Sequence, residues 1–464
     1  MRSDLSFDPD LLRRYDRPGP RYTSYPTAPQ FSEAFGEAAF RDAARRSNAE
    51  PIPRRLSLYA HIPFCFSPCF YCGCNRVITR DRSRAGTYLA RLVREIARVA
   101  PLFDRDREVI QLHLGGGTPN FLDAGQLEEL LDSLGQHFHF SAAPSRDFSI
   151  ELDPRCVGPR DVAALARMGF NRASLGVQDF DPKVQDAVNR VQSVAETMAV
   201  IDACRTSGFR SVNVDLIYGL PGQHREGFAR TLDIVTGVRP DRLAIYSYAH
   251  LPRMFRAQRQ IDETLLPAPE DKLGLLRLAI EKLSEAGYRY IGMDHFALPD
   301  DELSQAQEKG GLHRNFMGYT THAESDLVGL GVSAISHVGD TYSQNPRDLP
   351  AWEAAVDAGR LPVWRGMRLD ADDLVRADAI QQLMCSGAID VAAIEVRHGI
   401  EFGSYFGTAF DHLASLQADG LVEVDAAAIR ATSRGRLLLR IIAACFDRYL
   451  HEPAEAPVRF SKAI

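Results

Sequence analysis

The sequence lacks both a long apolar run and a strong excess of one charge. No apolar stretch approaches the roughly 20 residues that a helix needs to cross a bilayer. The chain has 54 lysine and arginine residues against 61 aspartate and glutamate residues, a net charge of −7. No global basic field would therefore attract nucleic acid or an anionic membrane surface. We expect neither a nucleic-acid partner nor a membrane span.

The chain also lacks the marks of an exported protein. Its first residues, MRSDLSFDPDLL, do not place a basic segment before an apolar one, as a secretory signal does. A chain of 464 residues can bury a sizeable core without disulfide bonds to hold it. We therefore expect a cytoplasmic protein whose cysteines are reduced.

Four of the eight cysteines nevertheless fall within ten residues. Cys65, Cys69 and Cys72 form a CxxxCxxC triplet, and Cys74 follows two positions later. A structural zinc site usually takes two separated CxxC-type pairs, which this spacing does not provide. Three thiolates can instead bind three irons of a cubane iron–sulfur cluster and leave the fourth iron open. The triplet thus favours a redox cluster over zinc or disulfides, which remain the alternatives.

The central half of the chain alternates β-rich runs with helical patterns. This order predicts a parallel sheet with outer helices, and six such units are too few for a closed eight-stranded barrel. We predict an α/β fold built on a partial (βα)6 barrel, with the cysteine loop at the C-terminal end of its first strand. The expected strands are 56–61, 109–114, 148–152, 172–177, 211–217 and 242–248, and the expected helices are 87–99, 125–138, 159–168, 195–206 and 227–235.

Two regions flank this core. Residues 1–50 contain the proline- and glycine-broken run GPRYTSYPT, which is typical of an irregular arm. Residues 365–464 are mostly helical, with two short β-runs around a turn that suggest a winged-helix-like domain. This domain has no dense basic patch, which disfavours DNA binding. The predicted domains are therefore 1–50, 51–364 (the barrel with its extension) and 365–464.

Several motifs together resemble a known family. The run YAHIPFC, which ends at Cys65, and the run CGCN, which starts at Cys72, resemble the cluster loop of radical S-adenosylmethionine (SAM) enzymes. Within that superfamily they are most similar to the oxygen-independent coproporphyrinogen III oxidases. Further family-like runs are 115–119, 248–252, 292–297, 312–316 and 331–336. With the arm and the C-terminal domain, the resemblance covers nearly the whole chain.

The resemblance implies a set of cofactors and site residues. One 4Fe–4S cluster would be held by Cys65, Cys69 and Cys72, and two SAM molecules would lie near it. The residues expected at the cluster-bound SAM are Tyr59, Tyr71, Gly116, Glu151 and Ile335. Those expected at the second SAM are Gly117, Thr118, Gln178, Arg190, Asp215 and Ala249. The residues expected to take part in catalysis are Tyr59, His61 and Cys74.

Two of these sites also have a physical reading of their own. The glycines of Gly115–Gly117 let the backbone approach a ligand closely, and we expect their N–H groups to be free to donate. Asp215 stands between apolar neighbours in an expected strand. A buried acid is costly unless it is paired, so Asp215 should have a cationic or hydroxyl partner.

The resemblance also implies an activity. A member of this family is an oxidoreductase that decarboxylates two propionates of coproporphyrinogen III to vinyl groups, giving protoporphyrinogen IX in anaerobic haem biosynthesis. Its partners would be that substrate and a low-potential electron donor such as flavodoxin or ferredoxin, and we expect a monomer. The four substrate carboxylates require cationic partners, for which Arg21, His61 and Arg314 are candidates.

The chain departs from the family pattern at three positions. Met317 and His322 stand where glutamines are expected, and Val191 stands where a glutamate is expected. The change at Met317 keeps an alternative open: a haem- or porphyrin-handling relative, either a haem chaperone or a haem-directed methyltransferase. A cluster-sensing transcription factor is disfavoured by the low basic charge. The electron donor, the terminal acceptor and the order of the two decarboxylations are not encoded in any motif.

Overall fold

The computed structural model describes residues 5–451, 460 and 462, which form two compact units. Unit 1 comprises residues 1–30, 268–323 and 369–464, and unit 2 comprises residues 31–267 and 324–368. Each unit is therefore assembled from segments that are far apart in the sequence. The three predicted domains, with boundaries near residues 50 and 365, stay a prediction.

Unit 2 contains the predicted partial barrel. Six parallel strands lie side by side in chain order. Each overlaps the run predicted for it, because these runs are rich in the β-branched and aromatic residues that favour strands. The strands are β1 (Arg55–Ile62), β4 (Glu108–Gly116), β6 (Asp147–Leu152), β7 (Arg172–Gln178), β8 (Ser211–Tyr218) and β9 (Arg242–Ser247).

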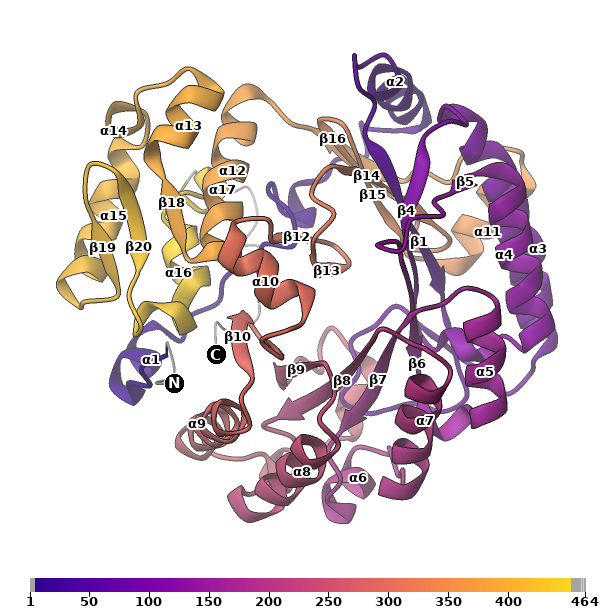
Figure 1. The fold of residues 1–464 in the computed structure, drawn as a ribbon, viewed down its shortest axis with the longest axis horizontal. Coiled ribbons are helices and arrows are strands. Elements are labelled where there is room, and N and C mark those ends of the chain that lie inside the picture. Colours follow the sequence, from indigo (N-terminus) through magenta and orange to yellow (C-terminus); the bar gives the residue numbers. More distant parts are fainter. Residues whose placement is uncertain (1–4, 452–459, 461, 463–464) are drawn as a thin grey trace. The chain divides into compact units, whose positions relative to one another are not determined.

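Helices link these strands and cover the outer side of the curved sheet (Figure 1). The five predicted helices are present: α3 (Ser83–Val99), α4 (Ala124–His137), α5 (Pro159–Arg167), α7 (Val194–Thr206) and α8 (Arg225–Val238). Gly169 and Gly208 follow α5 and α7 with positive φ, as expected of glycines that end helices. The short helix α6 (Pro182–Ala187) was not predicted.

The sheet continues beyond β1 through an extension. β14 (Ser325–Leu330) pairs in parallel with β1, so that Arg55 is aligned with Ser325. The antiparallel strands β15 (Ile335–Val338), β16 (Thr341–Gln344) and β17 (Arg365–Arg368) follow. Helices α2 (Glu37–Asn48) and α11 (Leu349–Asp357) also belong to this unit.

Unit 1 is mostly helical, as predicted for the end of the chain. Its small sheet has the order β18-β20-β19, so the predicted wing gains a third strand. The strands are β18 (Ala388–Asp390), β19 (Val422–Val424) and β20 (Ala428–Ala431), and the helices are α12 (Ala371–Ser386), α13 (Val391–His398), α14 (Phe402–Tyr405), α15 (Gly407–Ala418), α16 (Leu439–Ala444) and α17 (Arg448–His451).

The middle segment of the chain adds two helices and two β-hairpins to unit 1. In the hairpin of β12 and β13, Arg314 lies opposite Tyr319. These elements are α9 (Pro269–Glu285), β10 (Arg289–Gly292), β11 (His295–Ala297), α10 (Glu302–Lys309), β12 (His313–Asn315) and β13 (Gly318–Thr320).

The first 50 residues are more regular than predicted. They contain α2 and the helix α1 (Pro9–Tyr15), which the irregular-arm interpretation missed. Between them, the GPRYTSYPT run is held by the end of the chain. The Arg440 guanidinium donates to the carbonyls of Gly19 and Pro20, and the Tyr22 hydroxyl donates to Asp447. These contacts fix the GPRYTSYPT run within unit 1.

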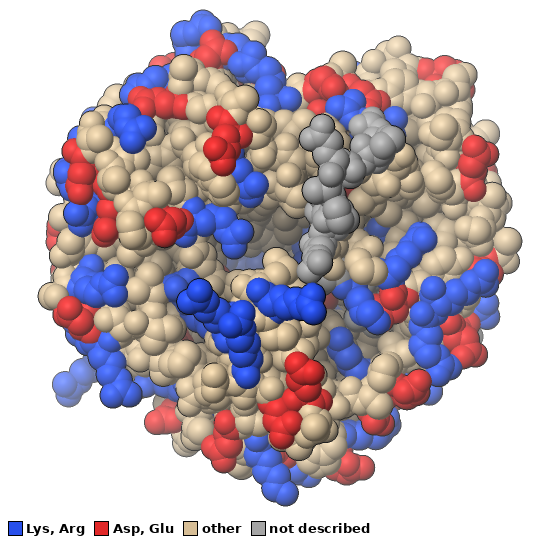
Figure 2. Space-filling model, turned by 180° about the vertical axis from the view of Figure 1, so that it is seen from behind, with Lys and Arg blue, Asp and Glu red and all other residues tan. Residues whose placement is uncertain are grey.

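The surface agrees with the charge composition. Figure 2 shows acidic and basic side chains interspersed over one face of the molecule. Among the described residues, no helix is long and apolar enough to span a bilayer. The expectation of a cytoplasmic protein stays a prediction.

Candidate active site

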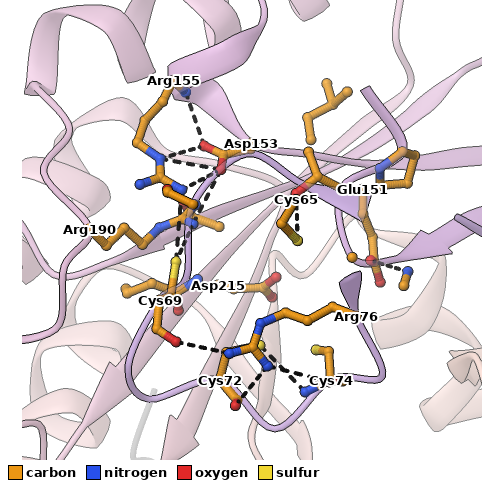
Figure 3. Close-up of a pocket in the computed structure, with 18 of the residues that line it drawn as sticks. Cys65, Cys69, Cys72, Cys74, Arg76, Glu151, Asp153, Arg155, Arg190 and Asp215 are labelled. Atoms are coloured by element: carbon orange, nitrogen blue, oxygen red, sulfur yellow. Dashed lines mark hydrogen bonds and ion pairs between the residues drawn. The ribbon is translucent and has the colours of Figure 1, made fainter. Parts of the chain in front are cut away.

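A cavity of about 210 Å³ lies where the C-terminal ends of the unit 2 strands meet the cysteine loop. Parallel strands bring their carboxyl ends to one edge, which is why residues from four of them, β4, β6, β7 and β8, converge here. Twelve of the predicted site residues line the cavity: Cys65, Cys69, Tyr71, Cys72, Cys74, Gly116, Gly117, Thr118, Glu151, Gln178, Arg190 and Asp215. Figure 3 shows the four cysteines of the loop interspersed with charged residues around the cavity.

The cysteine loop is closed at its base by a short parallel pair of strands, β2 (Phe64–Cys65) and β3 (Val77–Ile78). The amide of Thr79 donates to the Cys65 carbonyl over 3.0 Å. Inside the loop, the Arg76 guanidinium donates to the carbonyls of Cys69 and Cys72 at 3.2 and 3.1 Å. The loop is thus shaped by contacts that do not involve the thiols.

The thiols themselves accept hydrogen bonds from several sides. Cys69 Sγ lies 3.5 Å from Arg190 Nη1 and 3.8 Å from Arg155 Nη2. A hydrogen bond from the Cys74 side chain lowers the pKa of Cys72 to about 6. Burial acts in the opposite direction, and the nearby Arg76 cation helps to outweigh it. Burial raises the pKa of Cys65 to about 11, although Thr118 donates to its sulfur. A thiolate at Cys69 or Cys72 would therefore have positive charge close by.

The donor set fits a cluster better than a single ion. Among the residues that the structure describes, no three Cys, His, Asp or Glu side chains are grouped so that they could hold one metal ion. A zinc site would need such a group, whereas the thiolates of a cubane cluster each bind a different iron. Three soft thiols on one loop, facing one cavity, are suitable ligands for iron and sulfide.

The glycine segment after β4 packs against the end of β1. A side chain at Gly117 would place its Cβ 2.6 Å from the Pro63 carbonyl oxygen, and Gly116 has a φ of +119°. The N–H groups are not free, contrary to expectation. The Gly116 amide donates to Glu151 Oε2 over 3.0 Å and the Gly117 amide donates to the Ile62 carbonyl over 2.8 Å. The two amides therefore hold the turn in place. An ammonium group of a ligand requires hydrogen-bond acceptors, which the Glu151 carboxylate can provide.

Glu151 lies at the end of β6 and remains partly accessible, with 44% of its side chain exposed. Burial would raise its pKa, but hydrogen bonds from His113 and from the Gly116 amide outweigh that effect and lower it. The side chain is therefore a carboxylate at neutral pH. It faces the cavity with a negative charge that can accept from an ammonium or hydroxyl group.

Strands β7 and β8 supply another part of the cavity lining. Gln178 has a φ of +69°, a strained conformation for this residue that often marks a functional position. Asp215 accepts from Asn213 Nδ2 at 2.8 Å and from Ser174 Oγ at 3.2 Å. Burial raises the pKa of Asp215 to about 6, since neutral donors offset the burial only in part and Glu151 adds a like charge. The expectation of a hydroxyl partner is met by Ser174.

Four predicted site residues, Tyr59, His61, Ala249 and Ile335, do not belong to the cavity lining. Three of them lie just behind it. The His61 ring binds the Tyr59 hydroxyl and the Asn75 carbonyl, each at 2.9 Å, and burial lowers its pKa. Ala249 is tied to the loop by Gln258, whose amide donates to the carbonyls of Ala249 and Tyr71. Ile335 lies farther along the sheet, at the start of β15.

Sequence reasoning missed two arginines of the cavity, Arg76 and Arg155. Arg155 chelates Asp153, with contacts of 2.6 to 3.2 Å, and Arg190 reaches the same carboxylate at 3.4 Å. An aspartate that caps a short turn two residues before an arginine is the signal that could have revealed this pair. Asp153 thereby positions both of the cations that contact Cys69.

Comparison with known proteins places this geometry in a family. A model of the radical SAM superfamily matches residues 59–235, and a model of the HemN C-terminal domain matches residues 369–438. An oxygen-independent coproporphyrinogen III oxidase of Pseudomonas aeruginosa is 52% identical over the full length of both chains. One from Escherichia coli K12 is 48% identical over 99% of each chain. The chain belongs to the oxygen-independent coproporphyrinogen III oxidase family.

A solved structure agrees with this family assignment. The E. coli coproporphyrinogen III oxidase, described as a radical SAM enzyme, superposes with a TM-score of 0.92 at 47% identity. The match covers 96% of this chain and all of that one. Membership of the coproporphyrinogen III oxidase family implies a 4Fe–4S cluster and SAM as cofactors, and the thiols and carboxylates that line the cavity are suitable groups to bind them.

Proposed function

We propose that this protein catalyses the oxidative decarboxylation of two propionate side chains of coproporphyrinogen III to vinyl groups, giving protoporphyrinogen IX. The observation that carries this proposal is the full-length identity of 52% to a protein of that name. In each round the propionate loses a hydrogen atom, CO2 and one electron. The relatives favour this activity over the haem-handling alternative.

Cys65, Cys69 and Cys72 would hold the 4Fe–4S cluster, since all three face the cavity. When bound, the reduced cluster and SAM supply the radical chemistry that removes the hydrogen atom. The chain's own residues bind, orient and exclude water around these groups. Arg155 and Arg190, both held by Asp153, place positive charge beside the Cys69 sulfur.

Two SAM molecules would occupy the cavity and its surroundings. Support for the first comes from Glu151, whose carboxylate suits an ammonium group, with Tyr59, Tyr71, Gly116 and Ile335 as further contacts. Support for the second comes from Asp215, whose carboxylate suits hydroxyl donors, with Gly117, Thr118, Gln178, Arg190 and Ala249 as further contacts. These assignments rest on the family motifs and on the lining of the cavity.

Tyr59, His61 and Cys74 would assist catalysis. The neutral His61 ring links the Tyr59 hydroxyl to the Asn75 carbonyl, which holds the loop against the end of β1. Cys74 lines the cavity beside Cys72 without belonging to the ligand triplet. We further propose that the protein is a monomer and that it takes electrons from a flavodoxin or ferredoxin.

The test is an anaerobic assay of protein reconstituted with iron and sulfide. Incubation with SAM, a low-potential reductant and coproporphyrinogen III should yield protoporphyrinogen IX and two CO2 per substrate. The porphyrins are separated by chromatography after oxidation, and 5′-deoxyadenosine is measured in parallel. A preparation that holds its cluster and cleaves SAM, yet leaves coproporphyrinogen III unchanged, would refute the proposal.

A further inference from the structure

Buried arginines in the described part of the chain divide into two kinds. Five are less than 9% exposed: Arg107, Arg172, Arg190, Arg314 and Arg440. Four have an anionic or carbonyl partner. Arg107 pairs with Asp326 at 2.6 Å, Arg172 with Asp147, Arg190 with Asp153, and Arg440 with the Pro20 carbonyl at 2.8 Å. Arg314 is the exception.

The guanidinium of Arg314 is enclosed but largely unbonded. The residue is 4% exposed, and its Nε and Nη1 atoms are buried with no hydrogen-bond partner in the described chain. The guanidinium lies over the Tyr319 ring, 4.8 Å from the ring centre, across the β12–β13 hairpin. The Arg314 carbonyl accepts from Gln381 over 3.1 Å, which fixes the backbone below the side chain.

Such an arrangement is unfavourable in the protein alone. An arginine cannot release its proton to escape burial, as a lysine or histidine can. Stacking on a tyrosine offsets part of the lost hydration, but it satisfies neither Nε–H nor Nη1–H. A buried and positioned cation of this kind is suited to an anion that the described part of the chain does not supply.

The other two cationic candidates from the sequence are already engaged. Arg21 forms an ion pair with Asp294 within the same unit. His61 uses both ring nitrogens, and its lowered pKa keeps it neutral. Of the three residues considered for the substrate carboxylates, only Arg314 combines a permanent charge with unsatisfied donors.

We propose that Arg314 binds a carboxylate of the substrate, and that it thereby selects tetrapyrroles carrying propionate side chains. The inference rests on the proposed function for the identity of the ligand. A carboxylate offers about four lone-pair sites, enough for both unsatisfied N–H groups, and charge-assisted bonds of this kind are the strong ones. The Tyr319 ring would then serve as a support that fixes the plane of the guanidinium.

The test compares Arg314→Met with wild type, because methionine keeps much of the length and loses the charge. The KM for coproporphyrinogen III should rise about tenfold or more, as expected for loss of a charged hydrogen bond. Iron content and the affinity for SAM should be unchanged. The melting temperature without substrate should stay equal or rise, because the variant no longer buries an unpaired charge. Arg314→Lys, which keeps the charge, should recover part of the affinity.

Arg107→Met is the matched control, since Arg107 is equally buried but paired with the buried Asp326. It should lower the melting temperature and leave the KM unchanged. If Arg314→Met behaves in the same way, Arg314 is structural and the inference is wrong.

Binding of coproporphyrin III, the oxidised tetracarboxylate, separates this inference from the proposed function because it needs no turnover. It is followed by fluorescence in wild type and in Arg314→Met. Weaker binding by the variant supports the role of Arg314 even if the wild type fails to decarboxylate. Equal binding overturns it even if the wild type is active.

Discussion

The cysteine-loop cavity of unit 2 and the β12–β13 hairpin of unit 1 both bury arginine, but they treat its charge differently. In the cavity, Arg155 and Arg190 share the Asp153 carboxylate and contact the Cys69 sulfur. In the hairpin, Arg314 lies over an aromatic ring, and its Nε and Nη1 atoms have no hydrogen-bond partner among the described residues. The ion pairs of Arg155 and Arg190 can hold the cavity wall in place without a ligand. The Arg314 guanidinium, in contrast, would have its donors satisfied only when an anionic ligand binds.

The same contrast recurs inside the cavity between two aspartates. Burial acts on both, but the cations Arg155 and Arg190 reverse its effect at Asp153 and lower the pKa. Asp215 has only Ser174 and Asn213 as hydrogen-bond donors, and its pKa rises to about 6. We therefore interpret Asp153 as a structural residue that positions the two arginines, and Asp215 as a residue that is available to bind a ligand.

The largest expected effect concerns the cluster. Cys69→Ser should abolish retention of iron and sulfide after anaerobic reconstitution, because a hard hydroxyl is a poor substitute for a soft thiolate. The melting temperature should change little, since Arg76 and the β2–β3 pair shape the loop without the thiols. Cys74→Ser is the control and should retain its iron. Full iron content in Cys69→Ser, or stoichiometric zinc in the wild type, would contradict the assignment.

An intermediate effect is expected from the titration of Asp215. Its raised pKa of about 6 means that the carboxylate is mostly ionised at pH 7 and mostly protonated at pH 5. A SAM molecule that donates to this carboxylate should therefore bind about tenfold more weakly at pH 5 than at pH 7. Calorimetry with SAM between pH 5 and 8 measures this dependence.

Other ionisable groups near Asp215 could also change their charge with pH, so their titration must be considered. Glu151 has a lowered pKa and Arg190 is a permanent cation, so neither titrates in this range as Asp215 does. Asp215→Asn should bind SAM more weakly at pH 7 and lose the pH dependence. A dependence that survives in the asparagine variant would assign the titration to another group.

The smallest effect is expected at Met317, in the turn of the hairpin that carries Arg314. Its amide donates to Asn315 Oδ1 over 2.8 Å, so the turn keeps its conformation when the side chain changes. Met317→Gln restores an amide that the family pattern expects and should improve SAM affinity or kcat/KM by about 1 kcal/mol, roughly fivefold. Val191→Glu, at a side chain that is 64% exposed, should change either quantity far less. No gain from Met317→Gln would show that the hairpin does not use an amide here.

Much of the barrel could be predicted because its signals are local. The six strands and five helices follow hydrophobic runs that are complete within about ten residues. β14 was missed as a partner of β1 because their pairing joins residues 270 positions apart, such as Arg55 and Ser325. The division into two interleaved units has the same cause, since periodicity carries no information on which distant segments pack together.

The site residues that belong to sequence motifs could be predicted, whereas those whose positions depend on loop conformation could not. The four clustered cysteines and the strand residues Glu151, Gln178 and Asp215 all line the cavity. Arg76 was missed because its role depends on backbone carbonyls, which no residue pattern encodes. Arg155 was missed because its signal is short: a single aspartate two residues before it, at the start of a turn. The N–H groups of Gly116 and Gly117 were expected to be free because a sequence does not reveal what packs against a glycine.

The contact between the GPRYTSYPT run and Arg440 determines when this part of the chain can reach its native structure during synthesis. Arg440 lies 420 residues after Pro20, whose carbonyl it binds. At about 5–20 residues per second, a ribosome needs on the order of 20 to 80 s to make the intervening chain. The first segment to emerge is thus among the last to find its native neighbours. A nascent chain that stops short of Arg440 cannot complete unit 1, however well its barrel strands have already formed.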